Sequence, residues 1–292
     1  MKKSPLTLNP QRARDVAFIL REKLKGEGIF GKKKLPDDMA EKLLKKLDED
    51  AFLLFVTLTV SLDYMRDAEK LWESSLKTLQ DEEVNWIFSP NKVAKKGKEK
   101  LKEAMSKYKL AIRKDKDTSI WFRLSETLLK EFGGSVSNLF DKYNYDVEKI
   151  FRVMKERREE FPSLSGDKIF PHWIRSLKEK KGFSFKNLRK LPIPVDVHVA
   201  RATFTTGCIT GSYKAKGITG TIRKKVIEVW EKGLEGTEIT PIEMFRPLWL
   251  LSKYGCHYRK NGERPKLNEC PVKDFCVDGK VVITSKKVEV ET

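Results

Sequence analysis

Residues 159–177 read EEFPSLSGDKIFPHWIRSL, a pattern that predicts a helix ending near Phe161, a tight turn and a second helix from about Lys168. Proline and glycine bound the turn, Pro162–Gly166, as they commonly do between helices. A turn that leads into a helix N-terminus leaves free backbone amides, which are a ready phosphate-binding site. The small turn residues Ser163, Ser165 and Gly166 are therefore predicted to lie against phosphate.

A second stretch, LRKLPIPVDVHVARATFTTGC (188–208), contains a single carboxylate, Asp196, among basic, apolar and small residues. The residue before a proline favours extended backbone, so Leu191-Pro192 and Ile193-Pro194 predict a short extended approach. Asp196 then falls where a helix begins, and its carboxylate can accept hydrogen bonds from the free amides of the first turn. Capping alone would account for this residue.

The rest of the chain also has mainly helical periodicity, with Pro and Gly at the boundaries. Residues 51–78 predict one long, buried helix, although the composition of FLLFVTLTV also suits a strand. Only the tail GKVVITSKKVEVE alternates as a strand or small hairpin does. The predicted class is mainly α, with a short C-terminal β segment. The other predicted helices are 11–25, 37–47, 119–132, 145–160, 197–209, 219–232 and 241–254.

The chain is strongly basic, with 60 Lys and Arg against 42 Asp and Glu and a net charge of +18. Clustered cations favour a polyanionic partner, and nucleic acid is the leading candidate over an anionic membrane surface. Abundant Lys and Glu with few Gln also suit a hyperthermophile's protein. The Lys-rich segment 91–116 is interpreted as a solvated helix face. No apolar run reaches the roughly 20 residues of a membrane span, and the N-terminus lacks a secretory pattern, so a cytoplasmic, soluble protein is expected.

Together, Pro162–Lys168 and Pro194-Val-Asp-Val-His198 resemble the helix-hairpin-helix DNA glycosylases, which include endonuclease III and the archaeal 8-oxoguanine glycosylases. The Pro-Val-Asp-Val-His string is the sharper match and is close to the 8-oxoguanine branch. A third segment, Arg246–Cys256 followed by Cys270–Cys276, resembles the iron-sulfur loop of endonuclease III. The hairpin departs from the family pattern, because Ser163 and Ser165 stand in a region that usually carries two glycines.

The resemblance implies two interlocked helical domains with the hairpin at their junction. The predicted division is N-terminal helices over 1–50 that pack with the C-terminal unit, a helical domain over 51–194 and a C-terminal unit over 195–292. It also implies a monomeric base-excision enzyme that acts on double-stranded DNA containing a damaged base. The favoured base is an oxidised purine such as 8-oxoguanine.

In this family-derived interpretation, Lys168 attacks the sugar and forms a Schiff base, while Asp196 stabilises the oxocarbenium-like sugar and handles protons. A lysine can attack only as the neutral amine, which burial or cationic neighbours would favour. Two alternatives stay open: a monofunctional glycosylase without lyase activity, and a non-catalytic helix-hairpin-helix protein that only binds nucleic acid.

Weaker site predictions concern aromatic and histidine side chains. His172 and Trp173, which follow Lys168, are predicted either to line the base pocket or to pack in the core, and Trp121 and Phe122 either stack on a flipped base or belong to the core. His198 is predicted to contact DNA, although capping or packing explains it equally well.

The four cysteines, Cys208, Cys256, Cys270 and Cys276, all lie in the second half of the chain. In a cytoplasmic protein such a set favours metal or cluster binding over disulfides. The favoured hypothesis is a [4Fe–4S] cluster on the four thiolates. The match to the endonuclease III loop is partial, because the cysteine expected shortly before Cys270 is absent. A disulfide, a zinc site and reduced buried thiols are the rivals.

Overall fold

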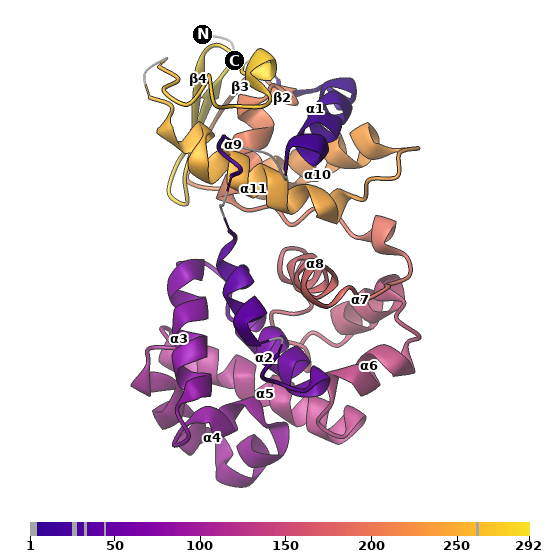
Figure 1. The fold of residues 1–292 in the computed structure, drawn as a ribbon, viewed down its shortest axis with the longest axis vertical. Coiled ribbons are helices and arrows are strands. Elements are labelled where there is room, and N and C mark those ends of the chain that lie inside the picture. The colour runs from indigo at the N-terminus through magenta and orange to yellow at the C-terminus, as the bar shows by residue number, and fades with distance from the viewer. Residues whose placement is uncertain (1–4, 25–27, 32–33, 44, 261–262) are drawn as a thin grey trace. The chain divides into compact units, whose positions relative to one another are not determined.

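The computed structural model describes residues 5–24, 28–31, 34–43, 45–260 and 263–292, and the chain divides into two compact units (Figure 1). Unit 1 is built from both ends of the chain, Met1–Leu35 and Pro192–Thr292, and unit 2 is the continuous segment Pro36–Leu191. Residues 36–50, which the sequence-based division grouped with the N-terminal helices, belong to unit 2. Their 3-10 helix is tied to that unit by buried ion pairs described below.

Unit 2 is helical throughout its described residues. The central helix is α2, in which every residue from Phe52 to Ser61 is buried, and it packs against α5, α6 and α8. This confirms a buried helix, and not a strand, for the apolar run. The helices of unit 2 are η1 (Pro36–Leu43), α2 (Glu49–Ser61), α3 (Ala68–Gln80), η2 (Asn85–Phe88), α4 (Pro90–Lys107), α5 (Lys114–Phe132), α6 (Val136–Lys142), α7 (Val147–Glu156), α8 (Ile169–Lys181) and η3 (Leu188–Lys190).

The single long helix predicted for 51–78 is wrong, because the chain turns between α2 and α3. Helix α2 is capped at Leu62, and Met65 takes a left-handed conformation with φ of 54°. Asp67 then caps α3 by accepting a hydrogen bond from the amide of Lys70. A short polar side chain that accepts a hydrogen bond from a free backbone amide favours the start of a new helix, even where the apolar periodicity of the sequence continues. The turn exposes one carboxylate, Asp63, to the first residues of α8.

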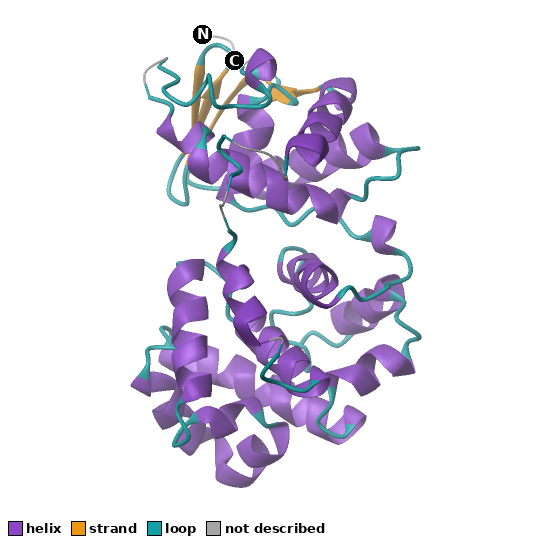
Figure 2. Ribbon diagram, viewed as in Figure 1, coloured by secondary structure: helices purple, strands orange, loops and turns teal. Residues whose placement is uncertain are grey.

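Unit 1 contains all the strands of the described structure (Figure 2). β1 pairs with β2, and a three-stranded antiparallel sheet has the order β3-β5-β4. The hairpin β4–β5 confirms the predicted C-terminal β segment, whereas β3, which is equally short, was not predicted. The elements are β1 (Thr7–Leu8), α1 (Pro10–Lys23), α9 (Val197–Thr205), β2 (Ile209–Thr210), β3 (Ser212–Ala215), α10 (Gly220–Leu234), η4 (Pro241–Met244), α11 (Phe245–Tyr254), η5 (Cys256–Tyr258), η6 (Lys273–Phe275), β4 (Lys280–Ile283) and β5 (Val288–Glu291).

The two chain ends meet inside unit 1, where α1 packs against α10. At Gly233 of α10 a Cβ atom would lie 2.8 Å from the carbonyl oxygen of Pro10 and 2.9 Å from the Cβ of Ala13. Only glycine permits this close approach. The buried face of α1 (Ala13, Val16, Ala17 and Leu20) completes the core of unit 1.

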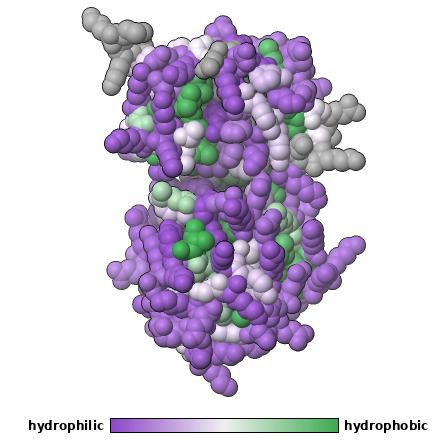
Figure 3. Space-filling view, turned by 90° about the vertical axis from the view of Figure 1, so that its left-hand side faces the viewer, coloured by the Kyte–Doolittle hydropathy of each residue, from purple (hydrophilic) through white to green (hydrophobic). Residues whose placement is uncertain are grey.

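The surface is largely hydrophilic, and the face shown in Figure 3 has only small groups of apolar side chains. The Lys-rich segment forms α4, whose lysines are mainly exposed, as the interpretation of a solvated face predicted. Gly97 interrupts this helix with φ of 80°. Among the described residues, no helix is both long enough and apolar enough to cross a membrane.

Candidate active site

The predicted turn lies between α7 and α8 and is closed by its own hydrogen bonds. The amide of Ser165 donates to the carbonyl oxygen of Phe161 at 3.1 Å, and that of Gly166 donates to Ser163 at 2.9 Å. Ser163 has φ of 66°, and a Cβ on Gly166 would lie 3.0 Å from the oxygen of Ser163, so the turn is tight. Helix α7 already ends at Glu156, before the predicted position.

Free amides follow the turn at the start of α8. The amides of Asp167, Lys168 and Ile169 have no hydrogen-bond acceptor among the described residues. They are the unsatisfied donors of a helix N-terminus, which favour an anion. The phosphate-binding amides therefore begin just after Ser163, Ser165 and Gly166, whose chief role in this structure is to shape the turn.

Lys168 stands at the N-cap of α8 and is held by the turn between α2 and α3. Its Nζ donates to the backbone oxygen of Asp63 at 3.0 Å and lies 3.8 Å from the Asp63 Oδ2 atom. The lysine side chain is 22% exposed and the Asp63 side chain 9% exposed. The amine is thus fixed in a largely buried position while remaining accessible from solvent.

Sequence reasoning missed Asp63. The signal was a lone carboxylate directly after twelve largely apolar residues, AFLLFVTLTVSL. A carboxylate at that position is buried by its neighbours and therefore needs a cationic or hydrogen-bonding partner. The sequence does not reveal that the partner lies more than a hundred residues away.

His172 lies one helical turn after Lys168 and is buried. Its Nε2 lies 3.5 Å from Asp63 Oδ2, and its Nδ1 lies 3.3 Å from a terminal nitrogen of Arg175. Burial, helped by the charge of Arg175, lowers the pKa of His172 to about 4. The imidazole is therefore neutral at neutral pH and belongs to a buried polar network.

Two of the predicted base-pocket aromatics are core residues instead. Trp173 is fully buried, donates from Nε1 to Thr57 Oγ1 and stacks on Phe140. Trp121 is likewise buried and donates to the backbone oxygen of Ile87. A ring buried on both faces cannot receive a base. Phe122 is only partly buried.

In unit 1, Asp196 caps α9 as predicted. Its Oδ1 accepts hydrogen bonds from the amides of His198 and Val199, each at 2.8 Å. Among the described residues, no donor hydrogen-bonds to Oδ2. The cap therefore fixes the orientation of the carboxylate while leaving one oxygen for other chemistry.

The side chain of His198 packs against other side chains of unit 1. Its ring centroid lies 4.6 Å from that of Trp249, and its Nδ1 lies 3.3 Å from Ser252 Oγ, which also accepts from Arg201 at 2.9 Å. Burial lowers the pKa of His198 to about 4. A neutral, partly buried imidazole is consistent with packing, which the sequence gave as the alternative to a DNA contact.

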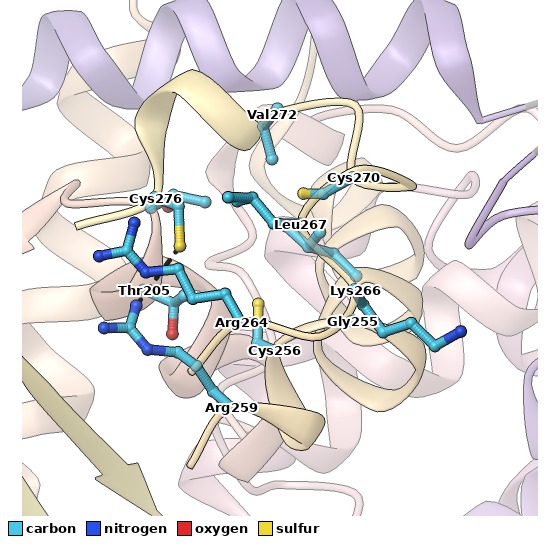
Figure 4. A pocket seen from close by; sticks show the side chains of 12 residues that line it. Thr205, Gly255, Cys256, Arg259, Arg264, Lys266, Leu267, Cys270, Val272 and Cys276 are labelled. Carbon is cyan, nitrogen blue, oxygen red and sulfur yellow. Dashed lines mark hydrogen bonds between the residues drawn. The ribbon is translucent and has the colours of Figure 1, made fainter. Parts of the chain in front are cut away.

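Three of the four cysteines line one pocket in unit 1, of about 30 Å³, as Figure 4 shows for Cys256, Cys270 and Cys276. An Arg259 terminal nitrogen donates to the sulfur of Cys276 at 3.4 Å. Cys208 is not among the lining residues, and its sulfur lies 3.2 Å from Thr206 Oγ1 in the core. Burial raises the pKa of Cys208 and of Cys256 to about 12.

The structure does not bring the four cysteines of the [4Fe–4S] hypothesis together, because Cys208 lies in the core and only Cys256, Cys270 and Cys276 line the pocket. The described part of the chain has no group of three or more His, Cys, Asp or Glu side chains placed to hold a metal ion. Leu267 lines the pocket at the position, shortly before Cys270, where a cysteine was expected.

Comparisons with known proteins agree with this fold. Residues 32–285 match the family model described as AGOG, N-glycosylase/DNA lyase. The structure resembles the crystal structure of 8-oxoguanosine-complexed Pa-AGOG, the 8-oxoguanine DNA glycosylase of Pyrobaculum aerophilum, with a TM-score of 0.54 and 15% identity over 91% of this chain and 94% of that one. No curated protein matches the chain in sequence. The mainly α, helix-hairpin-helix prediction is confirmed, and the chain belongs to the AGOG family, that of a DNA base-excision N-glycosylase.

Proposed function

We propose that the protein excises 8-oxoguanine from double-stranded DNA and then cleaves the strand through a Schiff base on Lys168. The observation that carries the proposal is the position of this lysine, whose amine is held at 3.0 Å by a backbone oxygen at the start of the second hairpin helix. The choice of substrate is supported by the structural similarity to Pa-AGOG, an 8-oxoguanine DNA glycosylase. Strand cleavage is supported by membership of a family of N-glycosylase/DNA lyases.

The chemistry begins with the neutral amine of Lys168. Its lone pair attacks the sugar C1′, the glycosidic bond breaks, and the base departs with the bonding electrons and takes up a proton. The nitrogen then loses a proton, the bond from C1′ to the ring oxygen breaks with its electrons going to that oxygen, which takes up a proton, and a cationic Schiff base remains. Removal of a proton from C2′ expels the 3′ phosphate by β-elimination, which cuts the strand.

Asp196 stabilises positive charge on the sugar as the base leaves, through the carboxylate oxygen that the cap does not use. The amides of Asp167, Lys168 and Ile169 bind a backbone phosphate of the same DNA. The damaged base leaves the stack before reaction, which costs a few kcal/mol and is easier for a damaged pair. The protein acts as a monomer in this scheme.

The test is borohydride trapping on duplexes that carry 8-oxoguanine, uracil, thymine glycol or an abasic site. Wild-type protein is expected to form a covalent adduct with the 8-oxoguanine and abasic duplexes, and Lys168→Ala is expected to form none. Lys149→Ala is the matched control, since it removes the same charge from an exposed lysine of α7.

Other outcomes of this experiment would support one of the alternative functions. Excision that yields abasic sites cleaved only by hot alkali, with no adduct, would mean a monofunctional glycosylase. Binding to duplex DNA without excision of any base would indicate a non-catalytic protein that only binds nucleic acid. An adduct that persists in Lys168→Ala would move the nucleophile to another residue.

A further inference from the structure

A line of buried polar side chains runs from the interior of unit 2 to the amine of Lys168. Arg175 donates to Asp37 Oδ2 at 2.7 Å, and the same nitrogen lies 3.3 Å from Nδ1 of His172. On the other side of the ring, Nε2 lies 3.5 Å from Asp63 Oδ2, which in turn lies 3.8 Å from the Lys168 Nζ.

The partners fix the tautomer of His172. A guanidinium only donates, so the imidazole nitrogen that faces Arg175, Nδ1, carries the lone pair. Because the ring is neutral, its proton then resides on Nε2, the nitrogen that faces the carboxylate of Asp63. The histidine therefore presents the positive end of its dipole to the carboxylate of Asp63 and helps to fix its orientation.

Asp63 holds Lys168 in two ways. Its backbone oxygen accepts a hydrogen bond from the amine, and its carboxylate supplies a negative charge beside the same nitrogen. The first contact survives any side-chain substitution, whereas the second depends on the carboxylate. The two contributions can therefore be separated by replacing the side chain alone.

We propose that Asp63 is a positioning residue that orients the Lys168 amine and stabilises the cationic Schiff base formed on it. This inference rests on the proposed function. When the amine becomes an iminium, its nitrogen keeps a positive charge, and the buried carboxylate 3.8 Å away pairs with it. A preorganised opposite charge in a water-poor site stabilises such a cation more than solvent does.

Other charged groups also act on this pair and must be kept unchanged in the test. Arg66, in the same turn, interacts with Asp63 and with Asp117, Arg113 and Asp67. From α8, His172 faces the carboxylate, with Arg175 and then Asp37 of η1 behind it. Substituting Asp63 alone leaves all of these in place.

The experiment is single-turnover borohydride trapping on an abasic duplex, measured from pH 5.5 to 9.5. For Asp63→Asn we expect the maximal trapping rate to fall about tenfold or more. Asp63→Glu keeps the negative charge and should restore most of the wild-type rate, which a substitution with only a structural effect would not do.

Asp67→Asn is the matched control, because it neutralises the next carboxylate of the same turn while asparagine caps α3 equally well. Circular dichroism and thermal melting report folding, and Asp63→Ser provides a second neutral variant. A folded neutral variant that keeps the wild-type rate, or an Asp63→Glu variant whose rate falls as far as that of Asp63→Asn, overturns the inference. If wild-type protein forms no adduct, or Lys168→Ala still forms one, the proposed function itself fails.

Discussion

Arg175 donates to Asp37 across 2.7 Å, with the arginine side chain 1% and the aspartate side chain 2% exposed. Lys180 of the same helix also lies 3.1 Å from this carboxylate. The pair ties η1 to α8 and explains why residues 36–43 belong to unit 2. Removing Arg175 would leave the buried carboxylate of Asp37 with one cation, Lys180, in place of two, and a buried charge that is only partly compensated is destabilising.

We therefore predict that Arg175→Met lowers the free energy of unfolding by up to about 3 kcal/mol, because Lys180 still pairs with Asp37. Combining Arg175→Met with Asp37→Asn should cost less than the sum of the two single variants, since the combination removes both charges. Urea unfolding monitored by circular dichroism measures both. Single variants within about 0.5 kcal/mol of wild type would contradict a buried, tightly coupled pair.

The histidines predict a loss of stability in mild acid. Burial lowers the pKa of His172 and of His198 to about 4 from an ordinary value of 6.5, and that of His257 is lowered too. Between pH 6.5 and 4 the unfolded chain therefore binds more protons than the folded one. The free energy of unfolding should fall as the pH drops through this window, by up to about 1.4 kcal/mol per pH unit for each of the buried residues His172 and His198.

Urea unfolding at pH 7, 6 and 5 checks this slope. His198→Gln should flatten it, since glutamine does not titrate, while its amide can still reach Ser252. An unchanged slope in this variant would show that His198 binds protons equally in both states.

Asp196 has two roles that a pair of variants separates. Asp196→Asn keeps an oxygen for the amides of His198 and Val199, so its stability should stay within about 0.5 kcal/mol of wild type. Excision should nevertheless fall by about a hundredfold or more, because the negative charge is lost. Asp196→Ala should lose the same activity and about 1 kcal/mol of stability as well.

Thermal melting and single-turnover excision of 8-oxoguanine measure the two effects. Normal excision by Asp196→Asn would reduce Asp196 to a helix cap, the simpler of the two roles that the sequence allows.

The cysteines provide a test that does not depend on activity. Burial raises the pKa of Cys208 and Cys256 to about 12 and that of Cys270 to about 11, so few of these thiols ionise at pH 8. Because the thiolate is the reactive form, all three should react slowly with a thiol reagent in the folded protein and quickly after unfolding.

Four reactive thiols per unfolded chain would exclude a disulfide. The same anaerobic sample, analysed for iron and for absorbance near 400 nm, tests the [4Fe–4S] hypothesis, and we expect neither signal. Stoichiometric iron would show that Cys208 or another group joins the pocket cysteines on cluster assembly.

Much of this architecture can be predicted from sequence because helix caps and turns are local. The tight turn before Lys168 and the cap at Asp196 depend on residues within a few positions of each other, and both occur as predicted. The contact between Asp63 and Lys168 was not predictable, since the two residues are far apart in the sequence. The position of Cys208 in the core, away from the three pocket cysteines, was not predictable either, because the sequence does not show which segments pack around it.

Unit 1 is made from the first and last parts of the chain, so the order of synthesis constrains its assembly. On the ribosome, residues 36–191 are complete and can fold before residues 192–292 emerge, because domains generally fold as units during translation. Helix α1 must wait, with its apolar face uncovered, until α10 supplies the contact at Gly233. Nascent chains arrested before residue 220 should therefore resist protease within 36–191 and be cleaved within 10–23. Protection of residues 10–23 would then report that α10 has been synthesised and has packed on α1.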